Sequence, residues 1–266
     1  MLKQTRLANG VRILSLPIPH AHSVALGVWL VNGSRHEEFH ESGYAHLLEH
    51  LLFKGTATLD ESELAQRFAA MGGQVNAHTG RELSALYGTV PAEDALALSN
   101  LFITMLLQPG FNESDIDREL KVIHQEFQET VADPEEEMEE WAISLAWQDH
   151  PLARPILSTP AAWREATPDK LRDYLNRVLQ GERLLVAATG AIQHDALLEC
   201  CAPLADLPRG QLPLTTPPSF HPGVYRRRSE STHRHLLWLM PIPGAADPAY
   251  PALLLGNDLL DRHPGR

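Results

Sequence analysis

The chain has 266 residues, enough for one or two domains of typical size and for a substantial buried core. Hydrophobic residues make up 44% and charged residues 21%, an ordinary globular composition that excludes a disordered, collagen-like or coiled-coil chain. The formal net charge of −12 argues against binding to nucleic acid or to an anionic membrane surface, because both require a basic surface.

Strand and helix signals alternate from the N-terminus onward. An Asn9-Gly10 turn between two short runs predicts a β-hairpin. An apolar run predicts a strand over Ser23–Val31. A helix is expected over Ser42–Phe53, where Gly55 follows its end.

The central part of the chain is expected to continue in the same way. Asp60 and Glu63 have the spacing of a capping box and predict a helix that ends near Met71. The elements expected after it are strands over 74–79, 83–90 and 183–189 and helices over 91–107, 112–130, 135–147, 167–179 and 191–205. This order predicts an α+β fold rather than strict βαβ alternation.

A change of composition marks the expected domain boundary. Residues 206–223 contain five prolines and are predicted to form an extended linker. A strand over 236–240 and an apolar helix over 250–260 are expected after it. The chain is therefore divided into a domain of residues 1–205, the linker, and residues 224–266 as the start of an incomplete second domain. Such a short segment cannot bury a core alone, so it is expected to pack on the first domain, find a partner or stay poorly ordered.

Two further features concern the compartment. Cys200 and Cys201 are neighbours, which cannot easily reach disulfide geometry, so reduced thiols are expected. No apolar signal segment follows the N-terminus, and no apolar stretch reaches the roughly 18 residues of a membrane span. We therefore expect a cytoplasmic protein without a membrane partner.

His46, Glu49 and His50 form the most informative motif. Residues three and four apart share one face of a helix, so both imidazoles can reach one metal ion with Glu49 beside them. Two imidazoles with open coordination positions suit zinc, and a nearby carboxylate can act as a general base toward water. From these residues alone, a metal site and a helix with two solvated or buried histidines both remain open.

A catalytic zinc site needs a third protein ligand, and Glu126 is a candidate. Glu119 lies two helical turns before it on the same expected helix face, where it could support a ligand. The alternative is a solvated acidic helix face, because many other glutamates lie nearby in the sequence.

The segment from Gly43 to Thr56, with the sequence GYAHLLEHLLFKGT, resembles the signature of the insulinase/pitrilysin family of zinc peptidases. Asn32-Gly33-Ser34-Arg35 before it and Gly72-Gly73-Gln74-Val75-Asn76-Ala77 after it extend the likeness, which is strongest to the processing-peptidase branch. The resemblance implies a mostly antiparallel sheet packed against helices, with the zinc motif on a helix. It also implies a zinc-dependent metalloendopeptidase that hydrolyses extended peptides.

The resemblance assigns roles residue by residue. His46, His50 and Glu126 match the zinc ligands, and Glu126 lies at the spacing where the family carries its third ligand. Glu49 matches the general base and Glu119 the carboxylate that supports the site, so these two are the expected catalytic residues. Asn76 and Ala77 match the edge strand that aligns the substrate peptide, a mode of binding that depends on backbone pairing.

The chain departs from the family pattern in its second half. The family's second domain supplies an arginine and a tyrosine, but the sequence contains no matching R-x-x-x-x-L-x-Y segment. We expect a truncated form, and the alternatives are a chain that pairs with a second peptidase half or a weakly active remnant. Non-catalytic subunits that bind peptides or stabilise a complex also occur in this family.

His36 and His40, in an acidic segment before the expected helix, are a weaker candidate for metal binding. Because the segment falls in a loop, we expect it to be solvated.

Overall fold

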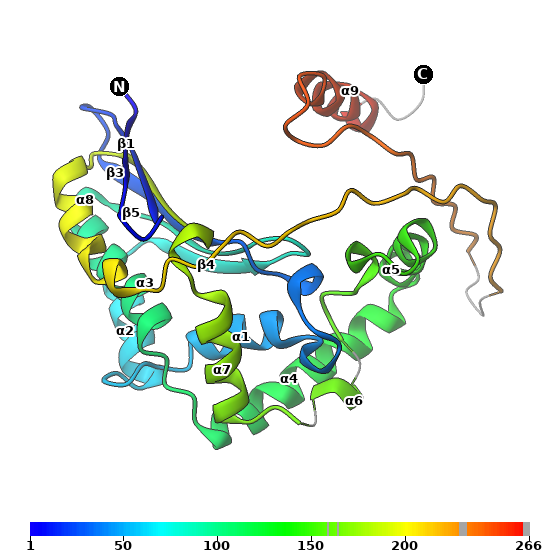
Figure 1. The fold of residues 1–266 in the computed structure, drawn as a ribbon, viewed down its shortest axis with the longest axis horizontal. Coiled ribbons are helices and arrows are strands. Elements are labelled where there is room, and N and C mark those ends of the chain that lie inside the picture. Colours follow the sequence, from blue (N-terminus) through cyan, green and yellow to red (C-terminus); the bar gives the residue numbers. More distant parts are fainter. Residues whose placement is uncertain (159, 164, 229–232, 263–266) are drawn as a thin grey trace.

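A six-stranded sheet organises the molecule (Figure 1). The computed structural model describes residues 1–158, 160–163, 165–228 and 233–262. The strands are β1 (Lys3–Arg6), β2 (Arg12–Pro17), β3 (Ser23–Leu30), β4 (Gln74–Thr79), β5 (Ser84–Pro91) and β6 (Leu184–Gly190). Their spatial order is β1-β2-β6-β3-β5-β4, and β2 with β6 is the parallel pair among otherwise antiparallel neighbours. The expected α+β class and mostly antiparallel sheet are confirmed, and β4 lies at one edge.

Helices cover one face of this sheet. The helices of the described chain are α1 (Tyr44–Leu52), α2 (Glu61–Ala70), α3 (Ala95–Leu107), α4 (Glu113–Ala132), α5 (Pro134–Trp147), α6 (Pro160–Trp163), α7 (Pro168–Val178), α8 (His194–Cys201) and α9 (Tyr250–Arg262). Figure 1 shows α1, α2, α3 and α7 on the same side of the sheet, with α4 beyond them. The C-terminal segment runs on the other side.

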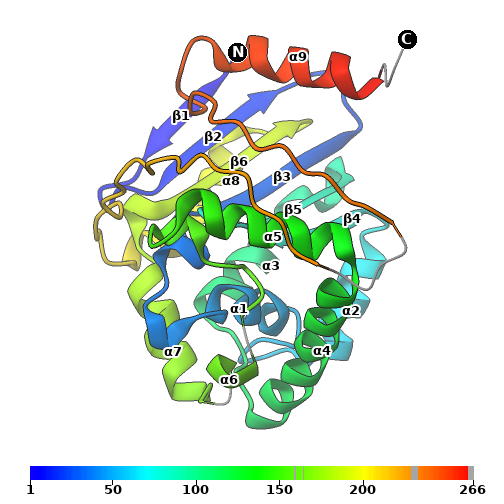
Figure 2. The ribbon, with the colours of Figure 1, turned by 90° about the vertical axis from the view of Figure 1, so that its right-hand side faces the viewer.

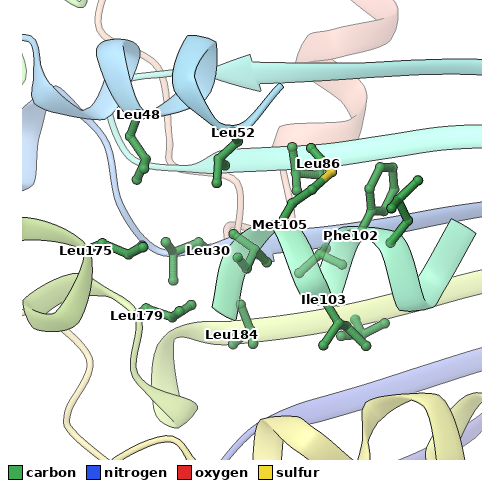
Figure 3. Packing of buried hydrophobic residues seen from close by; sticks show 14 of the residues in the cluster. Leu30, Leu48, Leu52, Leu86, Phe102, Ile103, Met105, Leu175, Leu179 and Leu184 are labelled. Carbon is green, nitrogen blue, oxygen red and sulfur yellow. The ribbon is translucent and has the colours of Figure 1, made fainter. Parts of the chain in front are cut away.

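The core lies between the sheet and helices α1 and α3. Every second residue of β3 is buried, as expected for a strand with one covered face. Helix α3 is apolar around most of its circumference and contributes Leu98, Phe102 and Met105. Figure 3 shows Met105 and Phe102 among side chains from the strands and from α1, including Leu48 and Leu52. This packing anchors the buried face of α1 and leaves its opposite face free for polar residues.

Local signals set most element boundaries. The expected hairpin is present, and Gly10 at its turn has a φ of +98°, a conformation that favours glycine. The Asp60–Glu63 capping box begins α2 as expected, with the Glu63 N–H donating to Asp60 at 2.8 Å. Helix α8 is shorter than expected and continues as a 3₁₀ turn, because Pro203 cannot supply a helical N–H.

The strand expected over 236–240 is wrong. These residues form no strand, and their large apolar side chains are exposed. A strand needs a neighbour to pair its backbone groups, and the described part of the chain offers none to this segment. The helix expected after it is present as α9, with Leu254 and Leu255 exposed.

The segment after α8 lies along α5 (Figure 2). Phe220 packs edge-on against Trp147 with ring centroids 5.9 Å apart, and Tyr225 packs in the same way against Trp141 at 6.5 Å. The His221 N–H donates to the Ala146 carbonyl at 3.0 Å. The segment that was expected to be a linker is therefore extended but held against one helix.

Cys200 and Cys201 form no disulfide. No helix among the described residues combines the length and the apolar character that a membrane crossing requires.

The core makes a quantitative prediction. Leu98 is fully buried, so Leu98→Ala should lower the free energy of unfolding by about 2–5 kcal/mol through lost burial and the cavity left behind. Leu214→Ala, at an exposed leucine, should change it by no more than about 0.5 kcal/mol. Urea denaturation of the two variants checks this, and equal losses would contradict the packing described here.

Candidate metal centre

Helix α1 presents two imidazoles to one point in space. Its buried residues are Tyr44, Ala45 and all four of its leucines, which pack into the core, so His46, Glu49 and His50 fall on the partly open side. One helical turn separates the two histidines, and their Nε2 atoms lie 3.3 Å apart. The HxxEH segment therefore converges two nitrogen ligands.

Helix α4 brings a carboxylate to the same point. Glu126 Oε2 lies 3.6 Å from His50 Nε2 and 3.9 Å from His46 Nε2. A tetrahedral ion such as zinc, bound at about 2.0–2.1 Å, sets its ligand atoms about 3.4 Å apart. The three atoms are therefore close to the spacing that one such ion requires, and they form the cluster with metal-binding geometry found among the described residues.

Glu119 stands behind His50. The carboxylate, 3% exposed, accepts a hydrogen bond from His50 Nδ1 at 3.1 Å, which leaves the His50 Nε2 lone pair directed toward the cluster. Lys54 Nζ lies 3.0 Å from the other Glu119 oxygen and 2.9 Å from Glu61. Glu119 thus orients one of the two imidazoles.

In the described part of the chain, His46 has no hydrogen-bond partner comparable to Glu119. Its Nδ1 is buried and has no hydrogen-bond partner among the described residues. Burial, and then the neighbouring His50, lower the pKa of His46 to about 4, so its ring is neutral at physiological pH. Burial raises the pKa of the Glu126 carboxyl, against the opposing effect of His50. Two imidazoles and one carboxylate are a donor set that suits zinc, and neutral rings offer the lone pairs it needs.

Glu49 lies beside the cluster and faces β4. Its side chain lines one small pocket together with Ala77 and His78. Among the described residues, no hydrogen bond or ion pair holds the Glu49 carboxylate. It is therefore available to exchange a proton with a molecule bound next to the cluster.

Asn76 and Ala77 lie on β4, the edge strand nearest to α1. The Ala77 N–H donates to the Asn76 side-chain oxygen at 2.9 Å, so this main-chain donor is held by its own neighbour rather than by β5. The outer side of β4 has no strand partner in the described part of the chain. An extended peptide could pair there if Asn76 rotated away.

Two residues near the centre were missed by the sequence analysis. Lys54 follows α1 and contacts Glu119, but a lysine four residues past a histidine carries no distinctive signal. Glu37, in the segment expected to be solvated, is buried, as is Glu41. The expectation of a solvated segment holds for Glu38 and His40, which are exposed. It is wrong for Glu37 and Glu41, because Gly43 and Ala45 donate backbone hydrogen bonds to Glu37 and Arg177 pairs with Glu41.

The fold and the cluster define a class of α+β proteins with a candidate metal centre on a helix. The family described as insulinase (Peptidase family M16) matches residues 12–160, which is more than half of the chain. A second description, the Peptidase M16 inactive domain, matches residues 165–265. The chain belongs to the M16 insulinase family of peptidases, and the resemblance seen in the sequence is confirmed.

Relatives and solved structures agree with this membership. The chain is 30% identical over 237 residues to the uncharacterized zinc protease YmxG of Bacillus subtilis, covering 89% of this chain and 58% of the relative. It is 32% identical over 215 residues to the mitochondrial-processing peptidase subunit beta of Neurospora crassa, covering 81% and 44%. A protease from Helicobacter pylori has the same fold, with a TM-score of 0.73 and 20% identity over 82% of this chain and 53% of that one.

The periplasmic protease PqqL of Escherichia coli also has this fold, with a TM-score of 0.71, 24% identity and coverage of 83% of this chain and 25% of that one. The chain thus spans about half the length, or less, of the relatives that it matches.

The centre predicts metal binding that depends on the converging atoms. Co²⁺ added to the purified chain should raise its melting temperature, and His50→Ala should remove the increase because one nitrogen ligand is lost. His124→Ala is the matched control, since His124 is exposed on α4 and lies outside the cluster. Thermal unfolding with and without Co²⁺ checks this, and an unchanged increase in His50→Ala would rule out the cluster as the binding site.

Proposed function

We propose that the chain is the zinc-dependent metalloendopeptidase half of an M16 enzyme, acting on extended peptides. The observation that carries this is the convergence of His46, His50 and Glu126 with a free carboxylate, Glu49, beside them. Relatives named zinc proteases support the choice of zinc as cofactor.

In this proposal His46, His50 and Glu126 hold the ion, which supplies Lewis acidity when bound. Glu49 takes the proton of the attacking water and later delivers it to the leaving amine. Glu119 keeps His50 in the tautomer with a free Nε2, through the hydrogen bond at 3.1 Å. Proton transfer and ligand orientation are thus separate tasks of two glutamates.

The substrate is proposed to be a peptide that pairs with β4 at Asn76 and Ala77. Edge pairing places backbone beside backbone, so affinity depends little on substrate sequence. Ala77 and Glu49 line the same pocket, which supports a scissile bond near Glu49 when a peptide lies along β4.

The domain arrangement is also part of the proposal. Residues 1–205 form the zinc-binding domain, 206–223 connect, and 224–266 begin a second, homologous domain. The apolar side chains of 236–240 and α9 are exposed, which supports the proposal that another part of the enzyme packs on them. That part is either further residues of the same protein or a second chain. The Neurospora crassa relative is named a subunit, which favours a partner chain of the same family.

The alternative is a peptide-binding or partner subunit without activity of its own. The exposed apolar side chains of 236–240 and α9 favour this alternative, because they offer a surface to a partner chain. The cytoplasmic location stays a prediction, and the structural neighbour PqqL is described as periplasmic.

The general base is tested by Glu49→Gln. The variant should retain zinc at wild-type affinity but lose at least about hundredfold in kcat on a fluorogenic peptide, because the amide cannot accept the proton. Glu139→Gln, at an exposed glutamate of α5, should leave both unchanged. The measurements are zinc content and peptide cleavage with and without chelator.

Cleavage by zinc-loaded Glu49→Gln at the wild-type rate would refute the base assignment. A wild-type chain that binds zinc tightly but cleaves nothing would favour the partner-subunit alternative.

A further inference from the structure

We propose that Glu37 is a positioning residue for the metal centre: its buried carboxylate fixes the first turn of α1 and thereby the place of His46. The inference rests on the proposed zinc site and adds to it a residue that lies outside the HxxEH segment. It concerns the binding of zinc, which is measured separately from turnover.

Glu37 caps α1 from six residues upstream. One carboxylate oxygen accepts the Gly43 N–H at 2.8 Å, and the other accepts the Ala45 N–H at 2.7 Å. The first amides of a helix lack partners within it, and the local cap residue, Gly43, has no side chain to supply one. Glu37 therefore satisfies two of these donors at once.

His46 depends on this turn more than His50 does. His46 is the third residue of α1 and directly follows Ala45, whereas His50 lies a full turn deeper. His50 is also held by Glu119, but His46 Nδ1 has no hydrogen-bond partner among the described residues. Fraying of the first turn would thus displace His46 while leaving His50 in place.

The surroundings hold Glu37 rigidly. Arg154 donates a hydrogen bond to the Glu37 main-chain carbonyl, and Glu37 is 3% exposed. Gly43 has a φ of +89°, and a Cβ there would collide with the Trp163 indole nitrogen, so no larger residue fits without a shift. The cap is therefore part of a packed corner rather than a mobile loop.

The charge state of Glu37 sets the assay conditions. Burial, and to a smaller extent the nearby Glu41, raise the pKa of Glu37 to about 7. The two backbone hydrogen bonds and Arg154 act in the opposite direction and lower the pKa. Tyr174 lies close enough for its own pKa to be affected by Glu37 and Glu41. At pH 8 the carboxylate form predominates, and it is also the form favoured at a helix N-terminus.

The test compares zinc affinity and helix stability at pH 8. Glu37→Gln keeps the shape but can accept only one of the two N–H groups, so zinc affinity should fall about ten- to hundredfold in competition with a chromophoric chelator. Thr167→Ala removes the cap of α7, where Thr167 accepts the Lys170 N–H at 3.3 Å. This control should lower the melting temperature but change zinc affinity by less than about twofold.

A spectroscopic measurement isolates the geometry. The visible absorption of the Co²⁺-loaded chain should weaken in Glu37→Gln, because His46 is less well held, and stay unchanged in Thr167→Ala. If Glu37→Gln does not fold, Glu37→Asp serves instead, since it keeps the charge but is too short to reach both amides, and it should weaken zinc binding at least about threefold.

Three results separate the proposals. Weaker zinc binding in the Glu37 variants than in Thr167→Ala supports the positioning role. Wild-type zinc affinity in a Glu37 variant with a lowered melting temperature overturns it and leaves the proposed function intact. A wild-type chain that binds no zinc refutes both.

Discussion

The packing of α1 against α4 is the constraint on which the candidate centre depends. His46 and His50 converge through helical geometry alone, but Glu126 comes from a helix far away in the sequence. Ile116 and Ile123 bury one side of α4, and Phe127 packs edge-on against Trp163 at 6.1 Å. A shift of about 1 Å between the helices would take the carboxylate out of reach, so apolar burial sets the spacing of the polar atoms.

Buried charges surround this junction and must be compensated. Glu119 is almost fully buried and is satisfied by His50 and Lys54, and Lys54 in turn pairs with Glu61 at the start of α2. Removing one member of such a set leaves the others unpaired, which costs more than the pair itself contributes. The network therefore joins three helices at the point where an ion would be held.

Apolar side chains are buried in the larger part of the molecule but exposed near the C-terminus. The sheet and helices α1–α4 and α6–α8 enclose a continuous core, while α9 and the residues before it expose apolar side chains. Contacts between the C-terminal segment and α5 hold its path but bury little of its far part. The same asymmetry underlies the proposal of a second half, because exposed apolar surface of this extent is unusual in a self-sufficient protein.

Local patterns in the sequence determined much of the fold. The Asn9-Gly10 hairpin, the Asp60–Glu63 cap and the helical face of the HxxEH segment follow from turn chemistry and period, and the structure contains all three. Glu126 was one candidate ligand among many nearby glutamates, and the family resemblance singled it out. The number of residues between His50 and Glu126 does not determine how far apart their side chains lie in space.

Only the tertiary structure decided the rest. Residues 236–240 have strand-like composition but form no strand, because pairing requires a neighbour that the described chain does not provide. The sequence around Glu37 predicts a solvated loop, yet Glu37 is buried. The first amides of α1 donate hydrogen bonds to its carboxylate, and the Arg154 side chain donates to its main-chain carbonyl. The sequence by itself determines periodicity and caps. Burial and long-range partners are decided when separate elements pack, since only then does each polar group lose water or gain a partner.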